Sequence, residues 1–139
     1  MTLAVVVDTS ALSALIFREP DALRYHEFMA ASDPVMALAT RVELGVVARR
    51  RLGVGGIEVA ETLLADYRVA FAPLDEEQAE IALAAMDRYG KGRGAEPAVL
   101  NYGDLFSYAL AKARDLPLLY KGDDFARTDV RSALAAAGG

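Results

Sequence analysis

The sequence predicts a single α/β domain over residues 1–139, a three-layer α/β/α sandwich with a mostly parallel central sheet. Short apolar stretches typical of buried strands alternate with longer segments whose apolar residues recur at helical spacing. The connections between these stretches are long enough to hold a helix, as parallel strands require. A chain of this length can also bury roughly two thirds of its unfolded surface, so one hydrophobic core is sufficient.

The first predicted strand, residues 3–7, organises the rest of the chain. It is an unbroken apolar run that ends in three valines, as expected for a strand buried on both faces of a parallel sheet. Asp8 follows it directly and therefore lies at the carboxyl edge of the sheet, where ligands bind in open α/β folds. Thr9 and Ser10 can then open a helix. Taken alone, Asp8 is explained equally well as the cap of that helix.

The remaining elements follow from apolar patterning and from turn and capping signals. They are, in order, a helix from Pro20 to about Ala31, a strand over 35–38, a helix from Thr40 to about Gly53, a helix over 57–67, a strand over 68–72, a helix after Asp75, a helix over 105–114 and a strand over 116–120. Three helix starts have capping-box spacing: Thr40 with Glu43, Asp75 with Gln78, and Asn101 with Asp104. If the last strand is parallel to the first, it brings Asp123 to the edge that carries Asp8.

Composition argues against several classes of protein. The chain has no cysteine, which excludes a disulfide framework and thiolate zinc sites and fits a reducing compartment. Its formal net charge of −5 argues against bulk electrostatic binding to nucleic acid, although a local basic patch can still hold phosphates. We expect a cytoplasmic protein, because neither a secretory leader nor an apolar run of the ~20 residues needed to span a membrane is visible.

The histidine and the basic segments allow only limited interpretations. His26 is the sole histidine and is expected to be a surface or packing residue, so serine-hydrolase and zinc-enzyme chemistry lose support. Arg49–Arg51 end the third predicted helix, where the helix dipole favours cations, and a phosphate-binding role remains the alternative. The basic loop over residues 90–94 lacks the Gly-Lys-Ser/Thr ending of a Walker motif.

Four acids are predicted to converge at one edge of the sheet. Asp8, Glu43, Asp104 and Asp123 each follow a predicted strand or lie in the first turn of a helix. Capping explains the first three singly, but it does not require acids at the same edge on separate crossovers. Because clustered carboxylates repel one another, a hard divalent cation with oxygen ligands explains the group best.

Several segments of the sequence resemble the PIN domain, and within it the VapC toxins of type II toxin-antitoxin systems. They are Val-Val-Asp8-Thr-Ser-Ala-Leu, the helix with Glu43, Tyr-Gly-Lys91-Gly-Arg93, Asn101-Tyr-Gly-Asp104-Leu-Phe-Ser-Tyr-Ala-Leu-Ala-Lys112, and Leu-Leu-Tyr-Lys-Gly-Asp123-Asp-Phe. The resemblance covers nearly the whole chain, and residues 90–112 are its most specific part.

This resemblance implies an endoribonuclease that depends on Mg²⁺ or Mn²⁺ and hydrolyses RNA with a metal-activated water. It assigns the catalytic metal ligands to Asp8, Glu43, Asp104 and Asp123, with the adjacent Asp124 as the alternative for the fourth position. It also implies a homodimer that is neutralised by a small antitoxin protein.

Other residues near these acids have open roles. Lys91, Arg93 and Lys121 are candidate phosphate contacts or ordinary solvated charges. Ligand contact and helix capping are both open for Thr9, Ser10 and Asn101. Base stacking and core packing are both open for Tyr102, Tyr108 and Tyr120.

Three alternatives to the nuclease are each disfavoured by specific residues. A phosphoacceptor receiver domain also gathers acids and a lysine around Mg²⁺, but it needs an adjacent pair of acids after the first strand, where this chain has one. A haloacid-dehalogenase-like phosphatase needs a second aspartate at the position of Ser10. A catalytically inactive PIN fold that only binds partners is disfavoured because all the acids are present.

Overall fold

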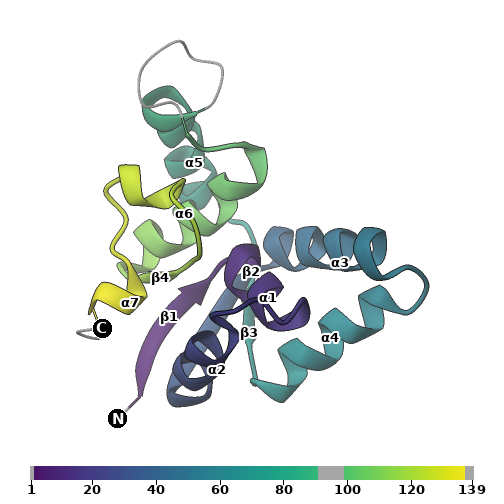
Figure 1. Ribbon diagram of the computed structural model, residues 1–139. Coiled ribbons are helices and arrows are strands. Elements are labelled where there is room, and N and C mark those ends of the chain that lie inside the picture. Colours follow the sequence, from purple (N-terminus) through teal and green to yellow (C-terminus); the bar gives the residue numbers. More distant parts are fainter. Residues whose placement is uncertain (1, 91–98, 137–139) are drawn as a thin grey trace.

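A four-stranded parallel sheet forms the centre of the computed structural model, which describes residues 2–90 and 99–136. Its strands are β1 (Leu3–Val7), β2 (Ser32–Ala37), β3 (Ala70–Ala72) and β4 (Leu118–Leu119), in the order β3-β2-β1-β4. All three pairings are parallel, so the carboxyl ends of the strands lie along one edge (Figure 1).

Helices cover both faces of this sheet. They are α1 (Thr9–Ile16), α2 (Ala22–Ala31), α3 (Leu38–Leu52), α4 (Gly56–Asp66), α5 (Glu76–Tyr89), α6 (Tyr102–Arg114) and α7 (Ala133–Ala136), with a 3₁₀ turn at Phe125–Arg127. Buried residues of α5 and α6 share one core with Val6, whereas those of α1 to α4 share the other core with Val5 and Val7. The predicted three-layer α/β/α architecture is therefore confirmed.

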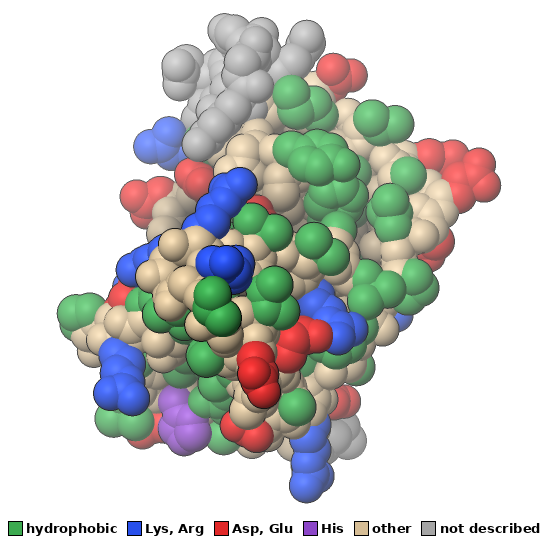
Figure 2. All heavy atoms as spheres, turned by 90° about the vertical axis from the view of Figure 1, so that its right-hand side faces the viewer, with side chains coloured by type: hydrophobic (Ala, Val, Ile, Leu, Met, Phe, Trp, Pro, Cys, Tyr) green, Lys and Arg blue, Asp and Glu red, His purple; other side chains and the backbone are tan. Residues whose placement is uncertain are grey.

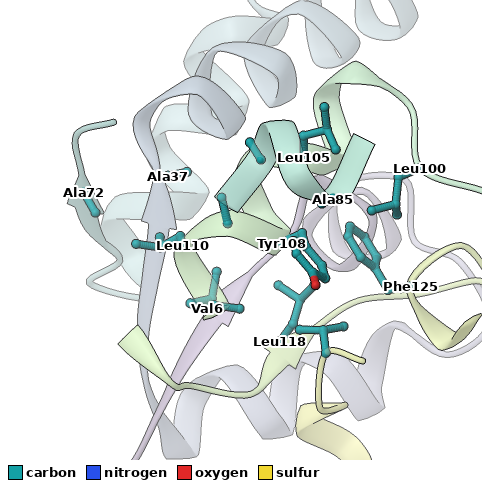
Figure 3. Close-up of a cluster of buried hydrophobic side chains, with 14 of the residues drawn as sticks. Val6, Ala37, Ala72, Ala85, Leu100, Leu105, Tyr108, Leu110, Leu118 and Phe125 are labelled. Atoms are coloured by element: carbon teal, nitrogen blue, oxygen red, sulfur yellow. The ribbon is translucent and has the colours of Figure 1, made fainter. Parts of the chain in front are cut away.

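The side chains of β1 explain why both faces must be covered. Successive residues of a strand point to opposite faces, and Val5, Val6 and Val7 are all fully buried. Burying each valine side chain stabilises the fold by about 1.5–3 kcal/mol relative to leaving it exposed, and this stabilisation would be lost on an uncovered face. Figure 3 shows the core on the α6 side, where Val6 lies among Leu110, Leu118 and Tyr108.

Several boundaries differ from the sequence prediction: β3 and β4 are shorter than predicted, α6 begins at Tyr102 rather than Leu105, and α4 is shifted by one residue. The differences at β2 and α3 have identifiable reasons. The strand β2 begins at Ser32 rather than Val35, and Pro34 is tolerated because β3 pairs with β2 only from Val35 onward. The helix α3 begins at Leu38, and the interpretation of Thr40 as its cap is wrong. Thr40 is instead buried inside the helix, facing α6.

The other two predicted capping interactions are confirmed. Asp75 accepts a hydrogen bond from the backbone N–H of Gln78 at 2.8 Å. Asn101 and Asp104 form a reciprocal capping box at the start of α6. These caps fix where α5 and α6 begin, and α6 thereby brings its first turn to the carboxyl edge of the sheet.

Several large apolar side chains of α3 and α4 remain exposed on the surface. Four of them, Leu38, Val42, Val46 and Ile57, line a groove of about 520 Å³ between the two helices. Figure 2 shows the molecule from the side on which α3 and α4 lie in Figure 1, with hydrophobic side chains in green on its surface. Within residues 2–90 and 99–136, no helix has both the length and the apolar character needed to cross a membrane.

Candidate active site

Asp8 lies at the end of the central strand β1 and is the most buried acid of the candidate site, with 4% exposure. Its Oδ2 accepts hydrogen bonds from the backbone N–H of Ser10 at 3.1 Å and from the Ser10 hydroxyl at 2.8 Å. Its Oδ1 accepts a hydrogen bond from the hydroxyl of Ser107 at 2.6 Å. Asp8 therefore caps α1, as one of the two sequence interpretations proposed, and it is also held from α6.

Glu43 reaches the same edge from the second turn of α3. The hydroxyl of Thr9 donates to its Oε1 at 2.7 Å, which ties α3 to the start of α1. Its Oε2 lies against the backbone of Gly103 so closely that a Cβ at that position would overlap it. Glycine at position 103 is thus required for the observed approach of Glu43 to the first turn of α6.

Asp104 completes the group from the first turn of α6. Its Oδ2 accepts the backbone N–H of Asn101 at 3.0 Å. The pKa of Asp104 is raised to about 6, chiefly by burial and further by the negative charges of Asp8, Asp124 and Glu43, while the hydrogen bond from Asn101 opposes the rise. The carboxylates therefore lie close enough to repel one another.

The pKa of Glu43 responds to the same surroundings. Burial raises it, the hydrogen bond from Thr9 lowers it, and the charge of Asp8 raises it again. An acid whose ionised form is disfavoured by both burial and like charges gains most from a nearby cation. A carboxyl group that was buried only for packing would not need a second acid beside it.

The two candidates for the fourth acid differ in their surroundings. Asp123 is exposed, whereas Asp124 is half-buried at the start of the 3₁₀ turn that follows β4. The charge of Asp124 contributes to the raised pKa of Asp104. Since β4 pairs in parallel with β1, both residues follow β4 at the same carboxyl edge of the sheet that carries Asp8, as expected.

The donor set of this site fits a hard divalent cation. Asp8, Glu43 and Asp104 offer only carboxylate oxygens, which Mg²⁺ and Mn²⁺ prefer, and the first turn of α6 adds the positive end of a helix dipole. Among the described residues, no three acidic or histidine side chains surround one point as closely as coordination requires. In the observed conformation Glu43 accepts a hydrogen bond from Thr9, and Asp104 accepts one from Asn101.

The candidate phosphate contacts are only partly placed. Lys91 and Arg93 lie outside the described residues. The ammonium of Lys121 contacts Glu19 at 2.5 Å and Asp21 at 2.8 Å, and these partners raise its pKa. A phosphate would have to displace both carboxylates from Lys121. Its backbone N–H, by contrast, donates to the Ser10 hydroxyl at 3.0 Å.

The three tyrosines have different environments. Tyr108 is buried and donates its hydroxyl to Asp129, and Tyr120 packs against Phe125, with ring centroids 5.3 Å apart. Tyr102 is 77% exposed and lines a hollow of about 420 Å³ beside Glu43. Solvent therefore reaches Glu43 through this hollow.

The structure also assigns contacts that the sequence analysis left open or missed. His26 contacts the Tyr67 hydroxyl at 2.5 Å on the surface, as expected for a packing residue. Ser107 was missed because a serine in the middle of a helix has no local signal of function. Its spacing of one helical turn from Asp104 places both residues on one face of α6, which could have indicated a shared site.

Residues 5–131 match the family profile of the PIN domain. The match covers most of the chain, including β1, the acid-bearing turns of α3 and α6, and β4. The chain belongs to the PIN domain family, and its relatives within that family are VapC ribonucleases.

Ribonuclease VapC of Mycolicibacterium smegmatis is 46% identical over 127 residues, which cover 90% of this chain and 96% of that protein. Ribonuclease VapC30 of Mycobacterium tuberculosis is 42% identical over 126 residues, covering 90% and 95%.

Solved structures have the same fold. The crystal structure of Mycobacterium tuberculosis VapC20, described as a Sarcin-Ricin loop cleaving toxin, superposes with a TM-score of 0.72 at 15% identity and covers 91% of this chain and 95% of its own. The DNA-bound VapBC structure from Salmonella typhimurium gives a TM-score of 0.63 at 20% identity, covering 95% and 96%. At these identities the likeness concerns the fold, which agrees with the parallel sheet found here.

Proposed function

We propose that this chain is a divalent-metal-dependent endoribonuclease and the toxin of a type II toxin-antitoxin pair. The observation that carries the proposal is the gathering of Asp8, Glu43 and Asp104 at the carboxyl edge of the sheet, where burial and then the neighbouring negative charges raise the pKa of Asp104 to about 6. Its 46% identical relative is named a ribonuclease, which supports RNA as the substrate.

In this proposal, Asp8, Glu43 and Asp104 hold Mg²⁺ or Mn²⁺, together with Asp124 or Asp123. When bound, such an ion acts as a Lewis acid and lowers the pKa of a coordinated water. The chain positions the acids through the hydroxyls of Thr9, Ser10 and Ser107. The hollow beside Glu43 leaves room for RNA to approach.

The proposal includes an antitoxin partner, a homodimer and action in the cytoplasm. Structural neighbours described as a toxin-antitoxin complex from Klebsiella pneumoniae and as VapBC from Salmonella typhimurium support an antitoxin. Co-expression with the protein encoded by the adjacent reading frame should yield a stable complex. A chain that is monomeric at micromolar concentrations and binds no such protein would contradict this part.

The deciding experiment incubates the purified full chain with RNA in Mg²⁺, in Mn²⁺ and in EDTA. We expect cleavage only with metal, and loss of cleavage in Asp8→Asn and Asp104→Asn with an unchanged circular dichroism spectrum. Asp75→Asn is the matched control, because Asp75 caps a different helix, α5, and is not among the proposed metal ligands, so its replacement should leave cleavage intact. Cleavage in EDTA that persists in both site variants would refute the proposal.

The receiver-domain alternative predicts a different outcome. It requires labelling of one aspartate by acetyl phosphate in Mg²⁺ and no RNA cleavage. The similarity to VapC ribonucleases over 90% of the chain favours the nuclease.

A further inference from the structure

The carboxylate of Asp8 receives a hydroxyl on each of its two oxygens. Ser10 donates to Oδ2 and Ser107 donates to Oδ1. An ionised carboxylate only accepts hydrogen bonds, so each serine must direct its single hydroxyl proton at Asp8. The direction of both hydrogen bonds is therefore fixed.

This constraint also fixes the next hydrogen bond in the chain. The Oγ1 of Thr40 lies 3.3 Å from the Oγ of Ser107, and either hydroxyl could donate on distance alone. Because the proton of Ser107 is committed to Asp8, Thr40 must donate to Ser107. The result is an ordered relay of hydrogen bonds from Thr40 through Ser107 to Asp8, in which Thr40 is 1% exposed and Ser107 is 0% exposed.

The relay joins the elements that carry the acids. Thr40 precedes Glu43 by one turn of α3, and Ser107 follows Asp104 by one turn of α6. Residues three positions apart lie on the same side of a helix. A single buried chain of hydrogen bonds thus links the end of β1 to α3 and α6, one helical turn away from Glu43 and Asp104.

We propose that Thr40 and Ser107 are positioning residues that orient the carboxylate of Asp8 for binding a divalent cation together with Glu43 and Asp104. This inference rests on the metal site of the proposed function. In known metal sites, loss of a group that orients a ligand typically weakens metal affinity about 10–100-fold. A relay that only satisfied buried polar atoms would affect stability without affecting metal affinity.

The test measures Mn²⁺ binding to the metal-free full chain by calorimetry. We expect Ser107→Ala to weaken binding about 10-fold and Thr40→Val, which keeps the shape but lacks the hydroxyl, by about 3–10-fold. Thr40→Ser keeps the hydroxyl and should bind within about twofold of the parent chain. Adding Thr40→Val to Ser107→Ala should cause no further loss, because Thr40 acts through Ser107.

Ser32→Ala is the control for loss of a hydroxyl. Ser32 donates to the carbonyl of Met29 at the start of β2, so its loss should not change Mn²⁺ affinity. Thermal melts of each metal-free variant report folding separately. If the parent chain binds Mn²⁺ and the folded Thr40→Val and Ser107→Ala variants bind it equally well, the relay has no positioning role, while the proposed function stands. If the parent chain neither binds Mn²⁺ nor cleaves RNA, the proposed function fails and this inference fails with it.

Discussion

Replacing Asp104 by asparagine separates a metal site from a simple helix cap. A folded-state pKa of about 6, against an ordinary value of 3.8, corresponds to about 3 kcal/mol of destabilisation at neutral pH. Solvent screening of this partly exposed group reduces the figure to about 1–2 kcal/mol. Asparagine can still accept the N–H of Asn101 but loses an interaction of about 0.5 kcal/mol with the helix dipole. We therefore expect Asp104→Asn to gain about 1 kcal/mol in EDTA at pH 7.5.

The sign of the pH dependence of the free energy of unfolding follows from the raised pKa of Asp104. Between about pH 4 and 6 the folded chain keeps a proton on Asp104 that the unfolded chain has lost. The free energy of unfolding of the parent therefore falls as the pH rises through this window, and the loss is complete above it. The variant lacks this contribution, so its advantage should vanish below about pH 4.

Thermal melts monitored by circular dichroism provide the assay. At about 4 °C per kcal/mol, Asp104→Asn should melt about 4 °C higher than the parent in EDTA at pH 7.5. In Mg²⁺ at a hundredfold excess over the dissociation constant, the parent gains about 2.7 kcal/mol, and the variant should lose most of that gain.

Asp75→Asn again provides the control, since it makes the same change at an aspartate that caps a different helix, α5. It should be neutral or slightly destabilising in EDTA and should retain the full Mg²⁺ shift. The reasoning is refuted if Asp104→Asn melts below the parent in EDTA and also retains the full Mg²⁺ shift. Asp104 would then be a cap only.

Three further substitutions test the structure. Gly103→Ala should lower RNA cleavage at least about 10-fold by displacing Glu43, without loss of stability, because alanine favours the helix by about 1 kcal/mol. Gly45→Ala is the control and should leave cleavage unchanged, since the nearest atoms to its new Cβ are 3.9 Å away. Equal activity in the two variants would contradict this prediction. Lys121→Met should lower the urea concentration at the unfolding midpoint slightly, because it removes the cation from its two carboxylate partners. An effect that persists unchanged in 1 M salt would argue against an electrostatic cause. Leu110→Ala should cost about 2–5 kcal/mol in the same assay, and a loss below about 1 kcal/mol would mean that the core beneath α6 is loosely packed.

The parts of the fold that could be predicted from the sequence are those determined by local chemistry. The apolar run ending at Asp8 defined β1, and the caps at Asp75 and Asn101 defined two helix starts, because each signal lies within a few residues. Thr40 misled the same reasoning. Its spacing to Glu43 matches a capping box, but its hydroxyl is used by Ser107, a partner 67 positions away.

The site was predictable in part for the same reason. Strand ends and helix starts indicated Asp8, Glu43 and Asp104, since a parallel sheet brings these ends to one edge. The hydroxyls beneath them could not be predicted, because they depend on how α3 and α6 pack against each other. The choice between Asp123 and Asp124 depends on the turn after β4, whose geometry is not encoded by any short motif.

The relay to Asp8 has a consequence for protein synthesis. Ser107 and Asp8 are separated by 99 positions, and β4, the partner of β1, comes still later in the chain. A ribosome must therefore synthesise most of the polypeptide before the acids can come together. A nascent chain that already contains β1 to β3 and the first five helices still lacks Asp104 and Ser107, so hydrolytic capacity is withheld until translation is nearly finished.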